Sequence, residues 1–161
     1  MEVIYVPRRL IEKAQELGID INDVVLKALA NTLNLDVREL TNARLEIAEK
    51  FLEEAKEYIR KRDPVQSSEK LYRAVEECIK VLAEVLKVPQ LEEVKKRGRW
   101  TTWLLGMAST DLSRVLREER IALTWSKAYE VHVWSLHEAR YRVEDVGIAV
   151  PVVEWLLTYT R

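Results

Sequence analysis

Both histidines of the chain lie in one ten-residue stretch, VHVWSLHEAR, at positions 131–140. Imidazole is the side chain best suited to proton transfer near neutral pH, with carboxylates and guanidinium groups as its usual partners. If the chain is an enzyme, the catalytic candidates are His137, Glu138, Arg140 and Arg142. His137 would act as acid or base and Glu138 or Glu130 would orient it. Arg140 or Arg142 would steady a phosphate in the transition state.

The spacing of the two histidines argues against a metal site. On an α-helix, residues 132 and 137 are separated by about 140° around the axis. A site on one helix needs histidines three or four residues apart and a further ligand. The same geometry places His137 on a face with Glu130 and Trp134, and His132 with Trp125 and Tyr129. We therefore expect no bound metal, and favour a bundle in which a neighbouring acid or carbonyl satisfies His137.

A second candidate stretch, KKRGRWTTW at positions 95–103, interleaves cationic and aromatic side chains. Single-stranded nucleic acid and nucleotides favour this combination of charge and stacking. A charged loop with core tryptophans behind it has the same pattern, and Arg114, Arg117 and Arg120 could add a basic stripe or a solvated face. The predicted binding residues are Lys95, Lys96, Arg97, Arg99, Trp100, His137 and Arg140.

Composition limits the classes of partner. The chain has 161 residues, of which 48% are hydrophobic, and 26 basic against 27 acidic side chains leave a net charge of −1. A nucleic-acid partner must therefore be held by a local patch. The single cysteine, Cys78, excludes an internal disulfide and is predicted to be a core residue, which fits a reducing cytoplasm. No apolar run approaches the about 18 residues of a membrane span, so we expect a cytoplasmic protein that makes no membrane contact.

Hydrophobic periodicity predicts an all-α, up-and-down helical bundle with a short N-terminal strand and a helical hairpin. The expected strand is 2–6, and the expected helices are 7–17, 21–34, 37–62, 64–87, a short one between Pro89 and Gly98, 101–118, 122–141 and 144–160. Residues 1–36 are expected to form an arm and residues 37–161 the bundle.

Local signals fix several helix ends. Asp20 is an expected N-cap, Asp36 and Glu39 have capping-box spacing, and Asp63 precedes a first-turn proline at position 64. The short turn at Asp63 predicts that the two long helices are antiparallel. Their apolar stripes, expected to pack together, are Ala43, Ile47, Phe51, Ala55 and Tyr58, with Ala48, Leu52 and Ile59 beside them, and Leu71, Ala74, Val75, Cys78, Leu82, Val85 and Leu86.

The N-terminal order of a strand and two helices is typical of a ribbon-helix-helix DNA reader. The expected strand, EVIYV, offers only Glu2 and Tyr5 to a DNA groove. A dimer-forming or docking arm is therefore the favoured interpretation, because an apolar strand edge attracts a second chain.

Three stretches carry a family resemblance: AEKFLEEAKEYIRKRDPVQSSEKLYRAVEECIKVLAE (48–84), GRWTTWLLGMA (98–108) and VHVWSLHEARYRVEDV (131–146). Their order and spacing, over about three quarters of the chain, resemble the archaeal PaREP family of HEPN-like helical domains. The resemblance implies a bundle that often pairs as a homodimer, in a clan with nucleotide-binding partners of nucleotidyltransferases and with metal-independent ribonucleases. Those ribonucleases carry an arginine four to six residues before a histidine, whereas here Arg120 is twelve residues before His132.

Together these features predict a non-catalytic, homodimeric HEPN-like binding module that needs no cofactor. It would recognise RNA, a nucleotide or a partner protein such as a nucleotidyltransferase. The alternatives are a metal-independent ribonuclease that uses His137, and a DNA-binding regulator that uses the N-terminal segment.

Overall fold

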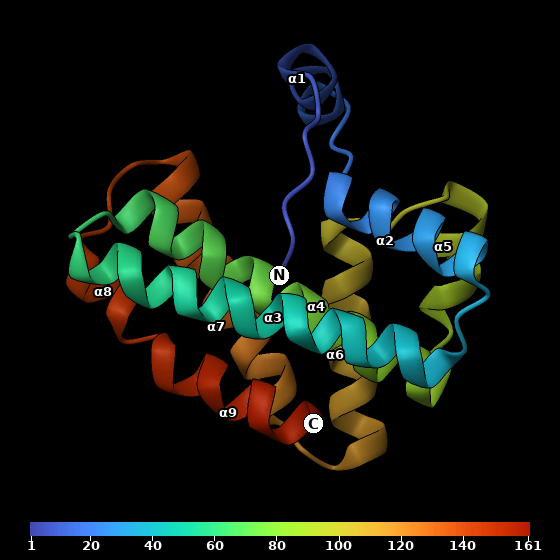
Figure 1. Cartoon of the computed structure of the whole chain (residues 1–161). Helices are drawn as coiled ribbons and strands as arrows, with labels where there is room; N and C mark the ends of the chain where they lie inside the picture. Colours follow the sequence, from blue (N-terminus) through green and yellow to red (C-terminus); the bar gives the residue numbers. More distant parts are fainter. The chain divides into compact units, whose positions relative to one another are not determined.

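The computed structural model describes residues 1–161, which divide into two compact units, Met1–Leu40 and Thr41–Arg161. The first contains helix α1 (Arg8–Glu16), helix α2 (Ile21–Leu33) and the first residues of helix α3 (Val37–Arg60) (Figure 1). It is a helical hairpin with an extended N-terminal segment.

The predicted strand at residues 2–6 is wrong, because this segment has no regular secondary structure. Its side chains are largely exposed, with Tyr5 98% accessible. β-branched and aromatic residues stabilise a strand only when it pairs with a neighbour and packs one face, and the chain has no second strand to pair with. The ribbon-helix-helix hypothesis thereby loses the strand on which it rests.

The predicted caps of this unit are confirmed. The Asp20 carboxylate accepts hydrogen bonds from the backbone N–H groups of Asn22 and Asp23, at 3.0 and 3.4 Å. Gly18 ends the first helix with φ of 67°, a left-handed conformation that glycine adopts without strain. Asp36 and Glu39 form the expected capping box, with reciprocal bonds of 2.8 and 3.1 Å at the start of α3.

Helices α3 and α4 (Pro64–Leu86) are antiparallel and lie side by side, as the sequence predicts (Figure 1). The Asp63 carboxylate caps α4 by accepting from the Gln66 N–H at 3.0 Å. Ion pairs connect the helices: Lys70 with Glu54 at 3.2 Å, and Arg44 with both Glu77 at 3.0 Å and Glu84 at 3.3 Å. Residue numbers that rise along one helix fall along the other, which is the order that a short turn imposes.

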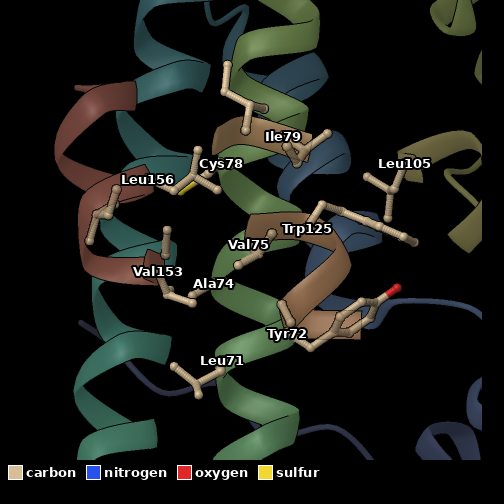
Figure 2. Close-up of a cluster of buried hydrophobic side chains, with 14 of the residues drawn as sticks. Leu71, Tyr72, Ala74, Val75, Cys78, Ile79, Leu105, Trp125, Val153 and Leu156 are labelled. Atoms are coloured by element: carbon tan, nitrogen blue, oxygen red, sulfur yellow. The ribbon is translucent and has the colours of Figure 1, made fainter. Parts of the chain in front are cut away.

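Helix α4 is the central element of the second unit. The remaining elements are α5 (Gln90–Arg97), α6 (Thr102–Leu116), α7 (Arg120–His132), a π-helical turn η1 (Val133–His137), α8 (Val143–Gly147) and α9 (Val150–Thr160). Helices α6, α7, α8 and α9 and the η1 turn all contact α4. Figure 2 shows the result: Val75 and Cys78 of α4 lie between Trp125 of α7 and Val153 of α9.

The predicted apolar stripes are right in most positions and wrong at one end. The centre of the α3 stripe is Ala48, Leu52 and Ala55, all buried, and Cys78 is buried as predicted. Val85 and Leu86 are 54% and 38% exposed. They occupy the last turn of α4.

The C-terminal third differs most from its prediction. The expected helix 122–141 ends at His132 and continues as the π-helical turn, and the expected helix 144–160 is two helices, α8 and α9. Pro151 lies in the first turn of α9, where its missing N–H is tolerated. Arg117 has φ of 54° and ends α6. The predicted stripe of Arg114, Arg117 and Arg120 therefore does not lie on one helix.

None of the helices combines the length and the apolar character that a membrane span requires.

Candidate histidine–aromatic site

The π-helical turn brings the two histidines together. At the end of this turn, the backbone N–H of Glu138 donates a hydrogen bond to the carbonyl of Val133 at 2.9 Å. This bond spans five residues, whereas a bond in an α-helix spans four. Residues five apart therefore lie one above the other, as residues three or four apart do on an α-helix. The Nε2 atoms of His132 and His137 are 3.1 Å apart, with the two rings nearly perpendicular. The prediction that these rings diverge is wrong, because it assumed a continuous α-helix.

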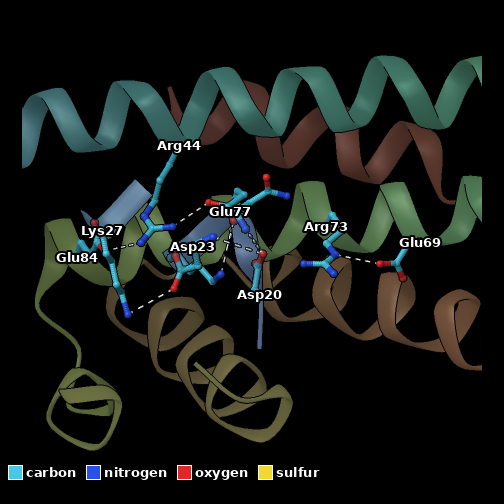
Figure 3. A network of polar contacts seen from close by, with 10 residues as sticks. Asp20, Asp23, Lys27, Arg44, Glu69, Arg73, Glu77 and Glu84 are labelled. Atoms are coloured by element: carbon cyan, nitrogen blue, oxygen red, sulfur yellow. Dashed lines mark hydrogen bonds and ion pairs between the residues drawn. The ribbon is translucent and has the colours of Figure 1, made fainter. Parts of the chain in front are cut away.

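Helix α4 holds the inner histidine. His132 is buried and stacks on the Tyr72 ring, with centroids 4.3 Å apart. Its Nδ1 atom lies 3.3 Å from Glu69 Oε2, an electrostatic contact without hydrogen-bond geometry. Arg73 donates from Nε to the other oxygen of Glu69 at 2.9 Å, one turn along the same helix (Figure 3). A row of polar side chains thus leads from α4 to the surface, in the order Arg73, Glu69, His132 and His137.

The environment of His132 sets its protonation. Burial lowers its pKa to about 4, a net value that includes the opposing effect of Glu69 and the smaller lowering effects of His137 and Arg73. The ring is therefore neutral at pH 7. The negative charge of Glu69 near Nδ1 favours the tautomer that carries its proton on Nδ1 and leaves Nε2 as an acceptor. His137 is then the donor of the bond between the rings.

His137 is exposed. Of the two carboxylates expected to orient it, Glu130 is hydrogen-bonded to other side chains. Glu130 accepts hydrogen bonds from Tyr141 Oη at 2.8 Å and Lys127 Nζ at 3.0 Å, which lower its pKa. Glu138 is exposed beside His137 in the sequence. His132 is therefore the direct hydrogen-bond partner of His137, and Glu69 acts behind it.

Sequence reasoning missed Glu69, Tyr72 and Arg73. They lie about sixty residues before the histidines, on a helix whose pattern indicates only a core element. The four-residue spacing of Glu69 and Arg73 signals an ion pair on a helix face. It gives no indication that a histidine packs against that pair.

The two arginines after His137 differ in their surroundings. Arg142 donates from Nε and Nη2 to the Asp145 carboxylate, at 3.0 Å for each bond, and Asp145 also accepts from the Arg142 backbone N–H. This arrangement caps α8. The Arg140 side chain is exposed, and its backbone N–H donates to the Trp134 carbonyl at 2.7 Å. The guanidinium of Arg142 is thus paired with a carboxylate three residues away, whereas that of Arg140 has no such local carboxylate partner.

The basic stretch forms the end of α5 and the turn before α6. Lys95, Lys96, Arg97 and Arg99 are all exposed, and Trp100 packs partly against the core. Arg97 pairs with Glu93 at 2.8 Å, and its guanidinium carbon lies 5.0 Å from the centre of the Trp103 ring. Gly98 ends α5 with φ of 75°. The predicted mixture of cations and an exposed aromatic ring is present here, with Trp103 as the exposed ring and Trp100 as the supporting one.

Tyr72 connects the two predicted stretches. The Thr102 side chain lies near the Tyr72 hydroxyl, and the ring of Tyr72 stacks on His132. Burial raises the pKa of the Tyr72 phenol, and the neighbouring Glu76 raises it further. Tyr129 and Trp125 continue the aromatic cluster, with ring centroids 5.1 Å apart. The first turn of α6 and the histidine pair therefore both lie next to this cluster of aromatic rings.

No group of three or more His, Cys, Asp and Glu side chains is arranged to hold a metal ion. A cluster with the ligand count of a structural zinc site is thus not part of this fold.

Comparison with known proteins identifies relatives of this fold. A crystal structure of a protein from Sulfolobus solfataricus is 34% identical to the chain, covers 70% of it and 92% of its own length, and superimposes with a TM-score of 0.63. No curated protein matches. The model of the Archaeal PaREP1/PaREP8 family matches residues 43–157. That match spans the second unit almost from end to end, and the chain belongs to the archaeal PaREP1/PaREP8 family.

Proposed function

We propose that this protein is a HEPN-like, non-catalytic module that binds single-stranded RNA or a nucleotide in the cytoplasm. The observation that carries the proposal is the position of Tyr72, whose hydroxyl lies near the Thr102 side chain at the start of α6 and whose ring stacks on His132. The basic turn before α6 and the histidine pair therefore lie on either side of the same buried tyrosine. Each alone has the composition of an ordinary surface, and together they supply charge, stacking surface and hydrogen-bonding groups.

Three kinds of contact follow from the chemistry of these residues. The cations of the turn, Lys95 and Lys96 first, would neutralise phosphates. Trp103 and Trp134, 49% and 45% exposed, would stack on bases. His137 and Arg140 would donate hydrogen bonds to a phosphate or a base edge. A net charge of −1 makes this local patch the source of any attraction to RNA.

The resemblance to HEPN-like domains supports a homodimer as the working form. Such modules also act beside partner proteins, with nucleotidyltransferases among them. A protein that binds no RNA or nucleotide but does bind a nucleotidyltransferase would replace the RNA proposal by the partner-protein alternative.

The test is a binding titration with a fluorescent single-stranded RNA of mixed sequence at 50 and 200 mM salt. The charge reversal Lys95→Glu with Lys96→Glu should weaken binding about tenfold or more at low salt and flatten the salt dependence. The matched control, Lys50→Glu with Lys61→Glu, reverses two exposed cations on α3 and its C-terminal turn and should change affinity less than about twofold. Absence of salt-dependent binding by the unaltered protein would contradict the proposal.

A metal-independent ribonuclease is the second candidate, favoured by the chain from Glu69 through His132 to His137. In that reaction His137 takes the proton of an RNA 2′-hydroxyl. The freed oxygen attacks phosphorus, the bond from phosphorus to the 5′-oxygen breaks, and the 5′-oxygen takes a proton from water, so that a 2′,3′-cyclic phosphate remains. Arg140 would offset the charge on phosphorus.

Cleavage of the same RNA in EDTA separates the two functions. Activity that His137→Ala abolishes and Glu138→Ala leaves intact would support the ribonuclease. RNA that stays intact, or a cleavage rate that His137→Ala does not change, would dismiss it.

A further inference from the structure

We propose that the Nε2 atoms of His132 and His137 form a two-histidine site for one divalent transition-metal ion, such as Zn²⁺, Ni²⁺ or Cu²⁺. The site is set by the π-helical turn and would leave its remaining coordination positions to water or to an oxygen of a bound anion. This inference shares His137 with the RNA-binding proposal but does not rest on it, because the turn places the two nitrogens whether or not RNA binds.

The distance between the two nitrogens fits a common ion. Two imidazole nitrogens that each bind a metal at about 2.0–2.1 Å are about 2.9 Å apart at a bond angle of 90° and about 3.4 Å apart at 109°. The separation here is 3.1 Å, between those limits. Square-planar and tetrahedral preferences are thus both within reach of a small ring movement.

The ring orientations point to the same conclusion. A linear N–H···N bond between two imidazoles would place the ring centroids more than about 5 Å apart, because each centroid lies behind its nitrogen. The centroids are 4.8 Å apart and the planes meet at 88°. The rings are therefore inclined toward a shared point beside the line that joins the two nitrogens, which is where an ion would sit.

The groups behind His132 are those that support a metal ligand. A histidine that binds metal through one ring nitrogen usually presents the other to a carboxylate, which fixes the tautomer and the ring orientation. Glu69 Oε2 lies 3.3 Å from His132 Nδ1, close enough to form that bond after a small ring rotation, and Arg73 Nε donates to Glu69 Oε1 at 2.9 Å. Stacking on Tyr72 restrains the ring further. Glu69 and Tyr72 therefore fix the orientation of the His132 ring in the metal-free protein.

The outer side of the site is open. His137 is exposed, while His132 is only 9% accessible, so an ion would have protein on one side and solvent on the other. Imidazole suits zinc, copper and nickel better than calcium or magnesium. When such an ion binds, it replaces the proton shared between the two Nε2 atoms, and that proton passes to solvent.

The test uses the full chain and zinc chloride in a calorimetric titration. The expected result is one ion per chain with release of protons, which a change of buffer reveals. His137→Ala should weaken binding at least about a hundredfold, and the neighbouring change Glu138→Gln should leave it unchanged. Glu69→Gln, which alters only the support of His132, should weaken binding by about 10–100-fold. Circular dichroism checks that each variant stays helical.

A copper-loaded sample identifies the ligands directly. Its electron paramagnetic resonance spectrum should show coupling to two imidazole nitrogens in the unaltered protein and to one in His137→Ala. Zinc binding that survives His137→Ala, one ion per two chains, or coupling to a single nitrogen in the unaltered protein would each overturn the proposal.

Discussion

The Nε2 atom of His137 lies 3.1 Å from the Nε2 atom of His132, across a turn that closes over five residues. An α-helical turn would separate the two side chains widely around the axis. One change of hydrogen-bond register thus creates the pair, and helix α4 supplies the Glu69 and Tyr72 that hold it. The pair depends on the packing of α7 against α4.

The core around α4 should be sensitive to truncation. Ile79 is fully buried in it, and Ile79→Ala should lower the free energy of unfolding by about 2–5 kcal/mol, because it removes apolar contact and leaves a cavity. Ile148, 67% exposed, is the matched control, and Ile148→Ala should change stability by less than about 0.5 kcal/mol. Urea denaturation measures both. Similar losses for the two variants would show that the helices pack differently.

The contact between α6 and α7 depends on the absence of a side chain at Gly106. A Cβ atom there would lie 3.3 Å from the Trp125 ring. Gly106→Val should therefore push the ring aside and cost about 1–3 kcal/mol. Gly147 has no atom within 4 Å of the same position, so Gly147→Ala should be tolerated. Thermal denaturation of the two variants checks the difference, and a stable Gly106→Val protein would contradict the close approach.

Ser113 fixes the start of the helix that carries His132. Its hydroxyl accepts a hydrogen bond from the Ala122 backbone N–H at 2.9 Å, in the first turn of α7. This N–H has no partner within its own helix, so Ser113→Ala should cost about 1 kcal/mol, as the loss of a cap does. Ser126→Ala, on the exposed side of α7, should not destabilise the protein. Chemical denaturation separates the two, and equal effects would exclude the capping role.

Cys78 should be unreactive in the folded protein. Burial raises the pKa of its thiol to about 12, so the nucleophilic thiolate is scarce at pH 8. A thiol reagent at pH 8 should modify the chain only after denaturant unfolds it. The raised pKa also means that the unfolded thiol ionises first, so its contribution to stability is complete below about pH 9 and declines as the pH rises toward 12. Rapid labelling of the native protein would contradict this burial.

The sequence predicts much of the fold, because many helix ends are decided locally. The caps at Asp20, Asp36 and Asp63 and the glycine stops at positions 18 and 98 are short-range signals, and the structure confirms each. The apolar stripes of the two long helices identify their contact for the same reason. Two helical patterns joined by a turn this short can pack together only as antiparallel helices.

The candidate site could not be predicted to the same extent, because it depends on features without a local signal. A π-helical turn differs from an α-helical one by a single shifted bond, and VHVWSLHEAR contains no glycine or proline to mark it. The support from Glu69 and Tyr72 comes from a distant helix. Residues 2–6 show the opposite failure, since a strong local preference for a strand has no tertiary partner to satisfy it.

Nuclear magnetic resonance of the chain with ¹⁵N-labelled histidines, kept free of metal at neutral pH, tests the central relationship most directly. The account predicts that His132 carries its proton on Nδ1, that its Nε2 is unprotonated, and that a scalar coupling connects this Nε2 to that of His137. Glu69→Gln should weaken the preference for that tautomer. A His132 protonated on Nε2, or two rings with no coupling between them, would contradict the account.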